Sequence, residues 1–351
     1  MNKPQITIAG RPIGPAHPPY VISELSANHN GSLETALRLI AAAAKTGADA
    51  VKIQTYTADT ITMQSDRPEF QITEGKWAGQ SLYDLYKSAN TPWEWHGQMF
   101  DHAKKCGITM FSSPFDPTAV DLLEDLNAPA YKIASFEAVD LPLISYVAST
   151  GKPMIISTGM ADADEIGEAI AVARDGGCTE LAILQCVSGY PAPADEYNLA
   201  TIPDMIERFG LVTGLSDHTL DNTTAIAAVA LGASIIEKHM TEDRNGGGPD
   251  DSFSLELDEF AQLCGGARTA WDAVGRVDYG RKSSEVSNVT FRRSLYFVKD
   301  LKAGDVVQEG DFRSVRPGFG AAPKMTDTVI GMRVRDDVQA GTPVLMDQLT
   351  S

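Results

Sequence analysis

The chain has 351 residues, of which 43% are hydrophobic, and its net charge of −18 makes the surface strongly acidic. Such a surface repels nucleic-acid phosphates and anionic lipids, so we expect neither nucleic acid nor a membrane as a partner. The N-terminus lacks an apolar signal core, no apolar run reaches about 18 residues, and the four cysteines lack metal-binding spacing, which together predict a cytoplasmic protein with reduced thiols.

Between residues 20 and 240, short apolar segments alternate with segments of helical periodicity. Apolar segments separated by helices predict buried strands of a parallel sheet. A stretch before the first of them, ITIAGRPIG, is expected to form a hairpin that closes the bottom of a barrel. The predicted strands are YVISE (20–24), AVKIQ (50–54), ITMFS (108–112), AYKIA (130–134), PMIIS (153–157), LAILQ (181–185), LVTGL (211–215) and SIIEK (234–238).

Several of the intervening helices carry start and stop signals. Ser32 precedes an apolar stripe with the 3.6-residue period, and Gly47 ends it. Thr91 is predicted to cap a second helix that has Pro92 in its first position and ends at Gly107. Further helices are expected to begin at Asp116-Pro117 and Asp140 and to cover 257–275.

Eight strand–helix units predict a (β/α)₈ TIM barrel. A doubly wound open sheet is the alternative, but no glycine-rich phosphate-binding sequence follows the first strand. Later in the chain, VKDLKAGDVV (298–307) and VRDDVQAGTPV (334–344) repeat one pattern, which predicts a small β-rich module with pseudo-symmetry. We therefore predict an α/β protein with a barrel and its hairpin at 1–280, a linker at 281–290 and the module at 291–351.

Two histidines lie where predicted strands end, His218 in GLSDHT and His239 in EKHMT. They are 21 residues apart, about one strand–helix–strand step, so neighbouring strands bring both imidazoles to one end of the barrel. Neutral imidazoles bind divalent metals, and two of them leave coordination positions for substrate and water. The alternative is a pair of hydrogen-bonded histidines near the core.

Two lysines, Lys52 and Lys132, lie inside the predicted strands. A buried lysine needs an anionic partner, so they either bind an anionic substrate or pair with Glu24 and Glu237. Gln54 shares the face of Lys52, and the loop 241–254 offers a carboxylate that can accept hydrogen bonds from sugar hydroxyls. The hydroxyl groups expected at the same strand ends are those of Ser135, Ser157, Thr158 and Ser216.

Ordered motifs along nearly the whole chain resemble the sialic acid synthase family. The motifs are ELSANHNG, VKIQTYT, YKIASFE, ISTGM, LQC-x-x-x-YP, GLSDHT, EKHMT and GGPDDSFSL, and VRPGFG resembles part of the second domain. The family joins a (β/α)₈ barrel to a C-terminal antifreeze-like (SAF) domain. Within it, ELSANHN, LYDLYK-x-x-x-TPWEWH and GGPDDSFSLE are most similar to pseudaminic acid synthases, whereas neuraminate and legionaminate synthases more often have E-I-G-x-N-H at the first site.

The resemblance implies an enzyme that condenses phosphoenolpyruvate with an amino-sugar aldehyde, here 2,4-diacetamido-2,4,6-trideoxy-L-altrose, and releases phosphate. It implies that His218 and His239 bind Mn²⁺, Mg²⁺ or Co²⁺, which polarises the aldehyde, and that Glu24 handles protons. It also implies a homodimer in which Arg316 reaches the partner's site, and a place in carbohydrate biosynthesis such as flagellin glycosylation. Ser188 stands where some relatives have asparagine. The remaining implied substrate contacts are Lys52, Gln54, Lys132, Ser135, Ser157, Ser188, Tyr190, Ser216 and Asp250.

Three alternatives stay open. The same chemistry can use N-acetylmannosamine or the legionaminate precursor as the sugar. A Schiff-base aldolase can use Lys132 or Lys238 as its nucleophile, and borohydride trapping distinguishes it. A non-catalytic protein can bind ice or carbohydrate through the C-terminal module, but the residues at the strand ends argue against that function.

Overall fold

The computed structural model describes residues 4–75 and 77–351. The chain divides into two compact units, Met1–Gly275 and Arg276–Ser351. None of the helices in the described residues combines the length and the apolar character that a membrane span requires. All four cysteines are free thiols.

The first unit is a closed barrel of eight parallel strands, which confirms the predicted fold class. The sheet runs in the order β10-β3-β4-β5-β6-β7-β8-β9, and β9 pairs again with β10 to close it. A short strand, β11 (Leu255–Glu256), adds to the edge of β10. The barrel strands are β3 (Tyr20–Glu24), β4 (Ala50–Thr55), β5 (Thr109–Pro114), β6 (Tyr131–Ile133), β7 (Met154–Ser157), β8 (Leu181–Cys186), β9 (Val212–Asp217) and β10 (Ile235–Thr241).

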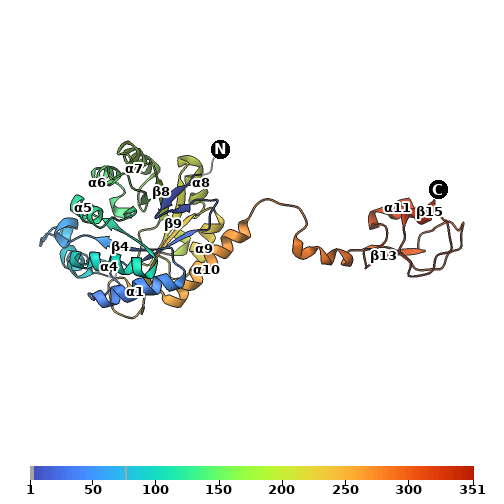
Figure 1. Ribbon diagram of the computed structural model, residues 1–351, viewed down its shortest axis with the longest axis horizontal. Helices are drawn as coiled ribbons and strands as arrows, with labels where there is room; N and C mark the ends of the chain where they lie inside the picture. Colours follow the sequence, from blue (N-terminus) through green and yellow to red (C-terminus); the bar gives the residue numbers. More distant parts are fainter. Residues whose placement is uncertain (1–3, 76) are drawn as a thin grey trace. The chain divides into compact units, whose positions relative to one another are not determined.

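Helices surround these strands, as Figure 1 shows for the first unit. Their apolar faces pack against the outward-facing side chains of the strands, such as Val21, Val51 and Ile53. The helices are α1 (Leu33–Thr46), α2 (Ala58–Ile61), α3 (Leu82–Ala89), α4 (Trp93–Cys106), α5 (Pro117–Asp125), α6 (Leu141–Ala148), α7 (Ala163–Asp175), α8 (Thr201–Phe209), α9 (Thr223–Ala230) and α10 (Leu257–Val274).

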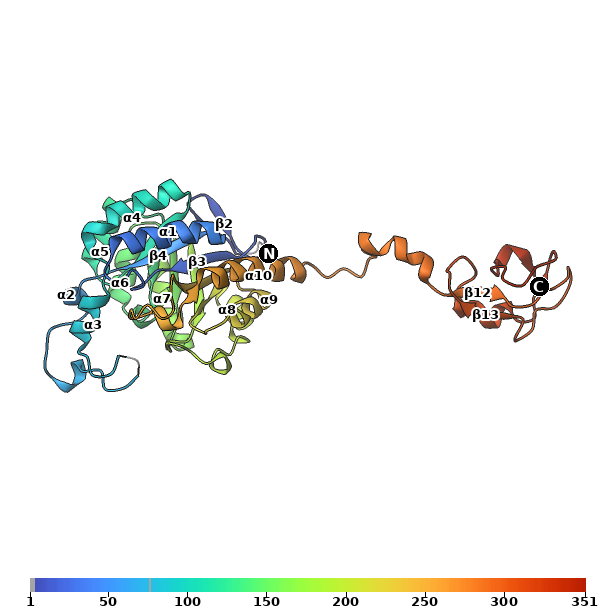
Figure 2. The same cartoon turned by 90° about the horizontal axis from the view of Figure 1, so that it is seen from below.

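The predicted hairpin closes the bottom of the barrel. Strands β1 (Ile6–Ile8) and β2 (Arg11–Ile13) pair antiparallel. Their isoleucines pack against the lowest inward-facing layer of the barrel strands, which includes Phe111, Ile155 and Ile235. In Figure 2, the hairpin and the long loop between α2 and α3 lie at opposite ends of the first unit. The bottom is therefore an apolar plug, and any chemistry is left to the other end.

The helix signals are mostly confirmed. Ser32 caps α1 by accepting a hydrogen bond from the Thr35 N–H, and Gly47 ends it in the left-handed conformation at φ 89°. The prediction for α4 is wrong by one residue. The helix begins at Trp93, with Pro92 in the cap position and no side-chain cap. Among the described residues, the buried Thr91 Oγ1 has no hydrogen-bond partner, so it does not cap the first turn.

The second unit folds around the predicted repeat. Leu301 and Val338 occupy equivalent positions in the two copies, and each donates a backbone hydrogen bond to the other. The Ala303 N–H donates to Asp337, and the equivalent Ala340 N–H donates to Asp300, so the contacts are reciprocal. A separate apolar core supports this pseudo-symmetry. The elements are β12 (Ser294–Phe297), β13 (Phe312–Val315), α11 (Thr326–Val329), β14 (Arg333–Val334) and β15 (Leu349–Thr350).

Acid is expected to destabilise the first unit through His96, a buried residue of α4. Its Nε2 lies 2.9 Å from Thr55 Oγ1 and its Nδ1 lies 3.1 Å from the Pro92 carbonyl oxygen. Burial lowers the pKa of His96 to about 4, from 6.5. Between these values the unfolded chain takes up a proton that the folded protein does not, so the free energy of unfolding falls as the pH falls from 6.5 to 4, by about 3 kcal/mol.

Urea unfolding of the wild type and of His96→Gln at pH 7 and pH 4.5 measures this contribution. Glutamine keeps a donor and an acceptor but does not titrate, so the variant should lose less stability than the wild type between the two pH values. Parallel losses in the two proteins would contradict the assignment.

Candidate active site

The barrel interior is polar above the apolar plug. On each strand, every second side chain faces inward, and the inward-facing side chains change from apolar to polar toward the carboxyl end. Residues two apart share a face, so Ile22 is followed inward by Glu24, Ala50 by Lys52, and Ile235 by Glu237 and then His239. Parallel pairing places Glu24 beside both Lys52 and His239. The predicted residues of three neighbouring strands therefore meet at one end of the barrel.

A fully buried cluster of charges forms the base of the site. Lys52 Nζ lies 2.8 Å from Glu24 Oε2 and 3.5 Å from Glu237 Oε1, and Lys132 Nζ lies 3.8 Å from the same Glu237 oxygen. Each of the four side chains is at most 6% exposed. The structure thus shows the pairing of lysines with glutamates that the sequence left open.

The cluster sets the pKa of its members in opposite directions. Burial raises the pKa of Glu24 to about 7, with Lys52 opposing and Glu237 adding to the shift. Burial also acts against ionised Glu237, but Lys132 and Lys52 outweigh it and hold its pKa below the usual range. Burial alone would lower the pKa of Lys52, yet Glu237 and Glu24 together raise it. Glu24 is therefore the carboxyl that can change protonation near neutral pH.

The two histidines lie above this cluster with their rings 5.4 Å apart, centroid to centroid. The Nδ1 of His218 lies 2.8 Å from the Val187 carbonyl oxygen, a contact that only an N–H can make, so Nε2 is the unprotonated nitrogen. Burial lowers the pKa of His218, and burial lowers the pKa of His239 well below 6.5. Both imidazoles are therefore neutral at pH 7.

These imidazoles fit a divalent metal as a partial set of ligands. In the described parts of the chain, the Nδ1 of His239 is buried without a hydrogen-bond partner, which is costly unless something else binds the ring. Within residues 4–75 and 77–351, no group of three or more His, Cys, Asp or Glu side chains could hold a metal ion. Protein side chains thus offer two nitrogen donors, and oxygen ligands from water or substrate would complete the coordination.

An aromatic wall borders the histidines. The ring of Tyr190 lies 4.4 Å from that of His218 and 6.0 Å from that of Trp77, which belongs to the long loop between α2 and α3. Phe253, from the loop after β10, packs 5.1 Å from His239. Burial raises the pKa of Tyr190, so its hydroxyl keeps its proton. The wall excludes water from one side of the imidazoles.

Several of the predicted hydroxyl groups lie at the carboxyl ends of β6 to β9. Ser135 Oγ and Ser188 Oγ are 2.8 Å apart, although the two residues follow different strands. Ser216 lies opposite Cys186 in the register of β8 and β9 and is 3% exposed. Among the described side chains, Ser157 Oγ is buried and has no hydrogen-bond partner. The carboxyl end of this half of the barrel thus offers several hydroxyl groups.

A hydrogen-bonded chain of side chains leads from Glu24 to the rim. Gln54 Nε2 donates to Glu24 Oε1 and to Ser26 Oγ, each at 3.1 Å. The hydroxyl of Ser26 donates in turn to Asp250 Oδ2, which also lies 3.4 Å from the Ala27 nitrogen. The structure therefore brings Gln54 and Asp250 together, and it adds Ser26, which the sequence did not single out.

Lys238 lies outside this site. Its side chain points away from the barrel interior, and Nζ lies 2.6 Å from Asp217 Oδ2 and 2.8 Å from the Thr219 carbonyl oxygen. Lys238 and Asp217 are partners in the register of β10 and β9, and each directly precedes one of the two histidines. We call this ion pair the strand brace. Because it faces the helices, Lys238 is not positioned as a Schiff-base nucleophile.

Three further residues of the site were missed. Ser113 Oγ accepts a hydrogen bond from Lys52 Nζ at 3.1 Å, and its place two residues after the inward-facing Phe111 could have indicated it. Cys186 faces inward between the serines by the same alternation. Burial raises the pKa of Glu137 to about 7, and Lys132 partly offsets the shift. Glu137 lies in a short 3₁₀ turn after β6, where strand alternation gives no signal.

Arg316 belongs to the second unit. It follows β13, precedes a cis bond to Pro317 and is exposed. Its predicted role in the site of a partner subunit remains a prediction.

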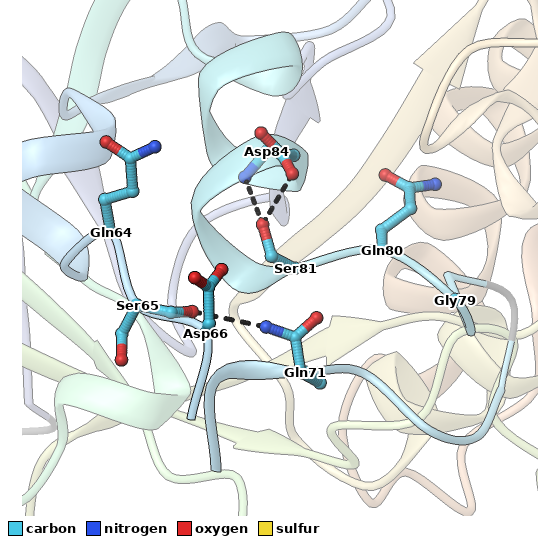
Figure 3. A pocket seen from close by; sticks show the side chains of 8 residues that line it. All are labelled: Gln64, Ser65, Asp66, Gln71, Gly79, Gln80, Ser81 and Asp84. Carbon is cyan, nitrogen blue, oxygen red and sulfur yellow. Dashed lines mark hydrogen bonds between the residues drawn. The ribbon is translucent and has the colours of Figure 1, made fainter. Parts of the chain in front are cut away.

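A surface hollow of about 300 Å³ in the long loop is a different feature (Figure 3). Its Ser81 caps α3 through the Asp84 N–H at 3.0 Å, and Gln71 donates to the Ser65 carbonyl oxygen. Among the described residues, carboxylates and amides line it. The buried lysines of the barrel are the reason to expect an anionic substrate at the strand ends.

Comparison with known proteins agrees with this architecture. The model of the NeuB family matches residues 39–279, and that of the SAF domain matches residues 292–350. The chain is 42% identical to the pseudaminic acid synthase of Campylobacter jejuni, covering 92% of this chain and 94% of the relative. It is 39% identical to the pseudaminic acid synthase of Helicobacter pylori, covering 95% and 98%.

A solved structure is similar as well. The crystal structure of N-acetylneuraminic acid synthetase from Leptospira borgpetersenii, in complex with citrate, matches with a TM-score of 0.73 and 29% identity. The match covers 82% of this chain and 95% of that one. The closed barrel, the second domain and relatives along nearly the whole length agree with the predicted resemblance, and the chain belongs to the NeuB family of sialic acid synthases, with a SAF domain after its barrel.

Proposed function

We propose that this protein is a pseudaminic acid synthase. It would condense phosphoenolpyruvate with 2,4-diacetamido-2,4,6-trideoxy-L-altrose to give pseudaminic acid and phosphate. The observation that carries the proposal is that two neutral histidines lie next to two buried lysines at one end of a barrel. This arrangement separates a site for an anion from a site for a carbonyl oxygen, and the chain is 39 and 42% identical to two synthases of this name.

Lys52 and Lys132 would hold phosphoenolpyruvate. Buried ammonium groups bind phosphate and carboxylate oxygens through charge-assisted hydrogen bonds, which are strong where water is excluded. Burial lowers the pKa of Lys132, and Glu237 offsets only part of this shift, so an incoming anion would favour its charged form. The hydroxyl groups that would complete the anion site are those of Ser135, Ser157, Ser188 and Ser216.

His218 and His239 would hold a divalent metal, Mn²⁺, Mg²⁺ or Co²⁺. When bound, the metal supplies Lewis acidity for the aldehyde of the sugar, whose carbon must accept a weak enol-phosphate nucleophile. Contacts within the protein fix the orientation of both imidazoles. The Val187 carbonyl oxygen orients the ring of His218, and Tyr190 and Phe253 pack against the two imidazoles.

Glu24 would act on the water that adds to carbon 2 of the enol phosphate. A carboxyl group with a pKa near 7 can take a proton from water and release it again at neutral pH. Gln54 orients the carboxyl group by donating a hydrogen bond to Glu24 Oε1, and Lys52 lies at Glu24 Oε2. Gln54 and Asp250 would also line the sugar subsite, where hydroxyl and amide N–H groups need acceptors.

We further propose a homodimer in which Arg316 of one subunit completes the sugar site of the other. Within the second unit, the segment 276–291 exposes several apolar side chains, and Val277 is 90% and Tyr279 100% exposed. Apolar side chains exposed in one segment are typical of a protein contact. We also propose a cytoplasmic location, since phosphoenolpyruvate is a metabolite of the cell interior and the cysteines are free thiols.

Phosphate release tests the proposal. The protein is incubated with phosphoenolpyruvate and Mn²⁺, with either the trideoxy-altrose sugar or N-acetylmannosamine, and with or without EDTA. We expect release with the trideoxy-altrose sugar alone and its loss in EDTA. Release in EDTA would contradict the metal, and absence of release with the trideoxy-altrose sugar would contradict the function.

A second candidate is the same reaction with another amino sugar, giving N-acetylneuraminate or legionaminate. The structural similarity to the N-acetylneuraminic acid synthetase of Leptospira borgpetersenii favours it, although the identity is 29%. Release with N-acetylmannosamine alone would establish this candidate and keep the mechanism.

A further inference from the structure

Ser26, the second residue after β3, adopts an unusual backbone conformation. Its φ is 46°, in the left-handed region that costs energy for any residue with a side chain and that glycine adopts freely. The residue is 4% exposed and lies within the site. Strained residues that persist in a buried site are usually held there by specific contacts.

The contacts of Ser26 are made by its hydroxyl group. Gln54 Nε2 can only donate, so Ser26 Oγ accepts from it at 3.1 Å, and the hydroxyl hydrogen is left for Asp250 Oδ2. The same Asp250 oxygen lies 3.4 Å from the Ala27 nitrogen. One hydroxyl thus fixes both an amide from β4 and a carboxylate from the loop after β10, two parts of the chain that are far apart in sequence.

This chain of hydrogen bonds extends away from the anion site. The contacts run in order from one end to the other: Lys52, Glu24, Gln54, Ser26 and Asp250. A carboxylate at that end repels the phosphate and carboxylate of phosphoenolpyruvate, but it accepts hydrogen bonds from the hydroxyl and acetamido N–H groups of a neutral sugar. Orientation of Asp250 therefore affects binding of the sugar and not binding of the enol phosphate.

We propose that Ser26 is a positioning residue that determines selectivity for the sugar by holding Asp250 and Gln54 in place. The inference rests on the proposed function. The backbone conformation at position 26 would be more stable with glycine, whereas sugar recognition requires the hydroxyl of serine. Fold stability and sugar binding therefore favour different residues at this position.

The experiment compares wild type, Ser26→Gly and Ser26→Ala by steady-state phosphate release with Mn²⁺, each substrate being varied in turn. For Ser26→Gly we expect kcat/KM for the trideoxy-altrose sugar to fall about tenfold or more, while the KM for phosphoenolpyruvate stays within about twofold. The Tm of Ser26→Gly should equal or exceed that of the wild type, because glycine relieves the strain. Ser26→Ala should show the same kinetic loss with a lower Tm, since alanine keeps the strain without the hydrogen bonds.

Ala9→Gly is the matched control. Ala9 is an exposed residue of the N-terminal hairpin with φ 49°, so its replacement relieves similar strain far from the site and should leave the kinetics unchanged. Wild-type kcat/KM in Ser26→Gly, or an equal rise in the KM for phosphoenolpyruvate, would overturn the inference. If the wild type turns over only N-acetylmannosamine, the proposed sugar is wrong, and the same variants decide the role of Ser26 with that sugar. If the wild type turns over neither sugar, the proposed function and this inference both fail.

Discussion

Replacement of His239 by alanine is expected to reduce phosphate release at least about 10³-fold, because the polarised aldehyde loses one of two protein donors to its metal. The fold should survive, since within the described residues Nδ1 of His239 has no hydrogen-bond partner to lose. Two measurements check this: steady-state turnover, and titration of the pure protein with Mn²⁺ by calorimetry. Binding of Mn²⁺ should weaken in step with activity, which separates loss of the metal from a general loss of the site.

His17→Ala is a suitable control for this substitution. His17 lies at the plugged end of the barrel, where its Nε2 is 3.0 Å from Gln5 Oε1. This variant should keep both turnover and Mn²⁺ binding. Turnover by His239→Ala near the wild-type rate, or unchanged Mn²⁺ binding, would remove the imidazole from the metal site.

Replacement of Lys52 by methionine is expected to raise the KM for phosphoenolpyruvate about 10²-fold or more, as loss of a buried charge-assisted contact should. It also leaves Glu24 without a nearby ammonium and Glu237 with Lys132 alone, so we expect the free energy of unfolding to fall by about 3 kcal/mol. Titration of phosphoenolpyruvate in turnover assays and urea unfolding measure the two effects.

A double variant separates binding from stability. In Lys52→Met with Glu24→Gln, the uncompensated carboxylate is gone, so part of the stability should return. Phosphoenolpyruvate binding should stay weak, because the ammonium is still absent. Recovery of both together would show that Lys52 supports the fold and does not contact the substrate.

The sequence was most informative where strand alternation decides the outcome. Glu24, Lys52 and His239 could be placed at one end of the barrel because each lies within or directly after a predicted apolar strand, and the period of two fixes which side chains face inward. The same rule could have indicated Ser113, two residues after Phe111. These predictions depend on local backbone geometry alone.

Residues beyond the strand ends were less predictable. Ser26 acts through a left-handed backbone, and Glu137 through a 3₁₀ turn, and neither conformation follows a regular period. The cap of α4 was misplaced because Thr91 has the right residue type but a buried side chain. Lys238 resembled a site residue in sequence, but it stands between the inward-facing Glu237 and His239, so the same alternation places it on the helix side, where it pairs with Asp217.

The strand brace has a consequence for how this protein can change. The Lys238–Asp217 pair ties β10 to β9 from the helix side, whereas every proposed sugar contact of the barrel lies on the inner side or on loops. Mutagenesis libraries can therefore vary positions such as 26, 54 and 250 while the support of the two imidazoles stays untouched. In the proposed function, the support of the two imidazoles and the contacts to the sugar therefore lie on opposite faces of the strands, and variants of the sugar contacts are expected to keep that support.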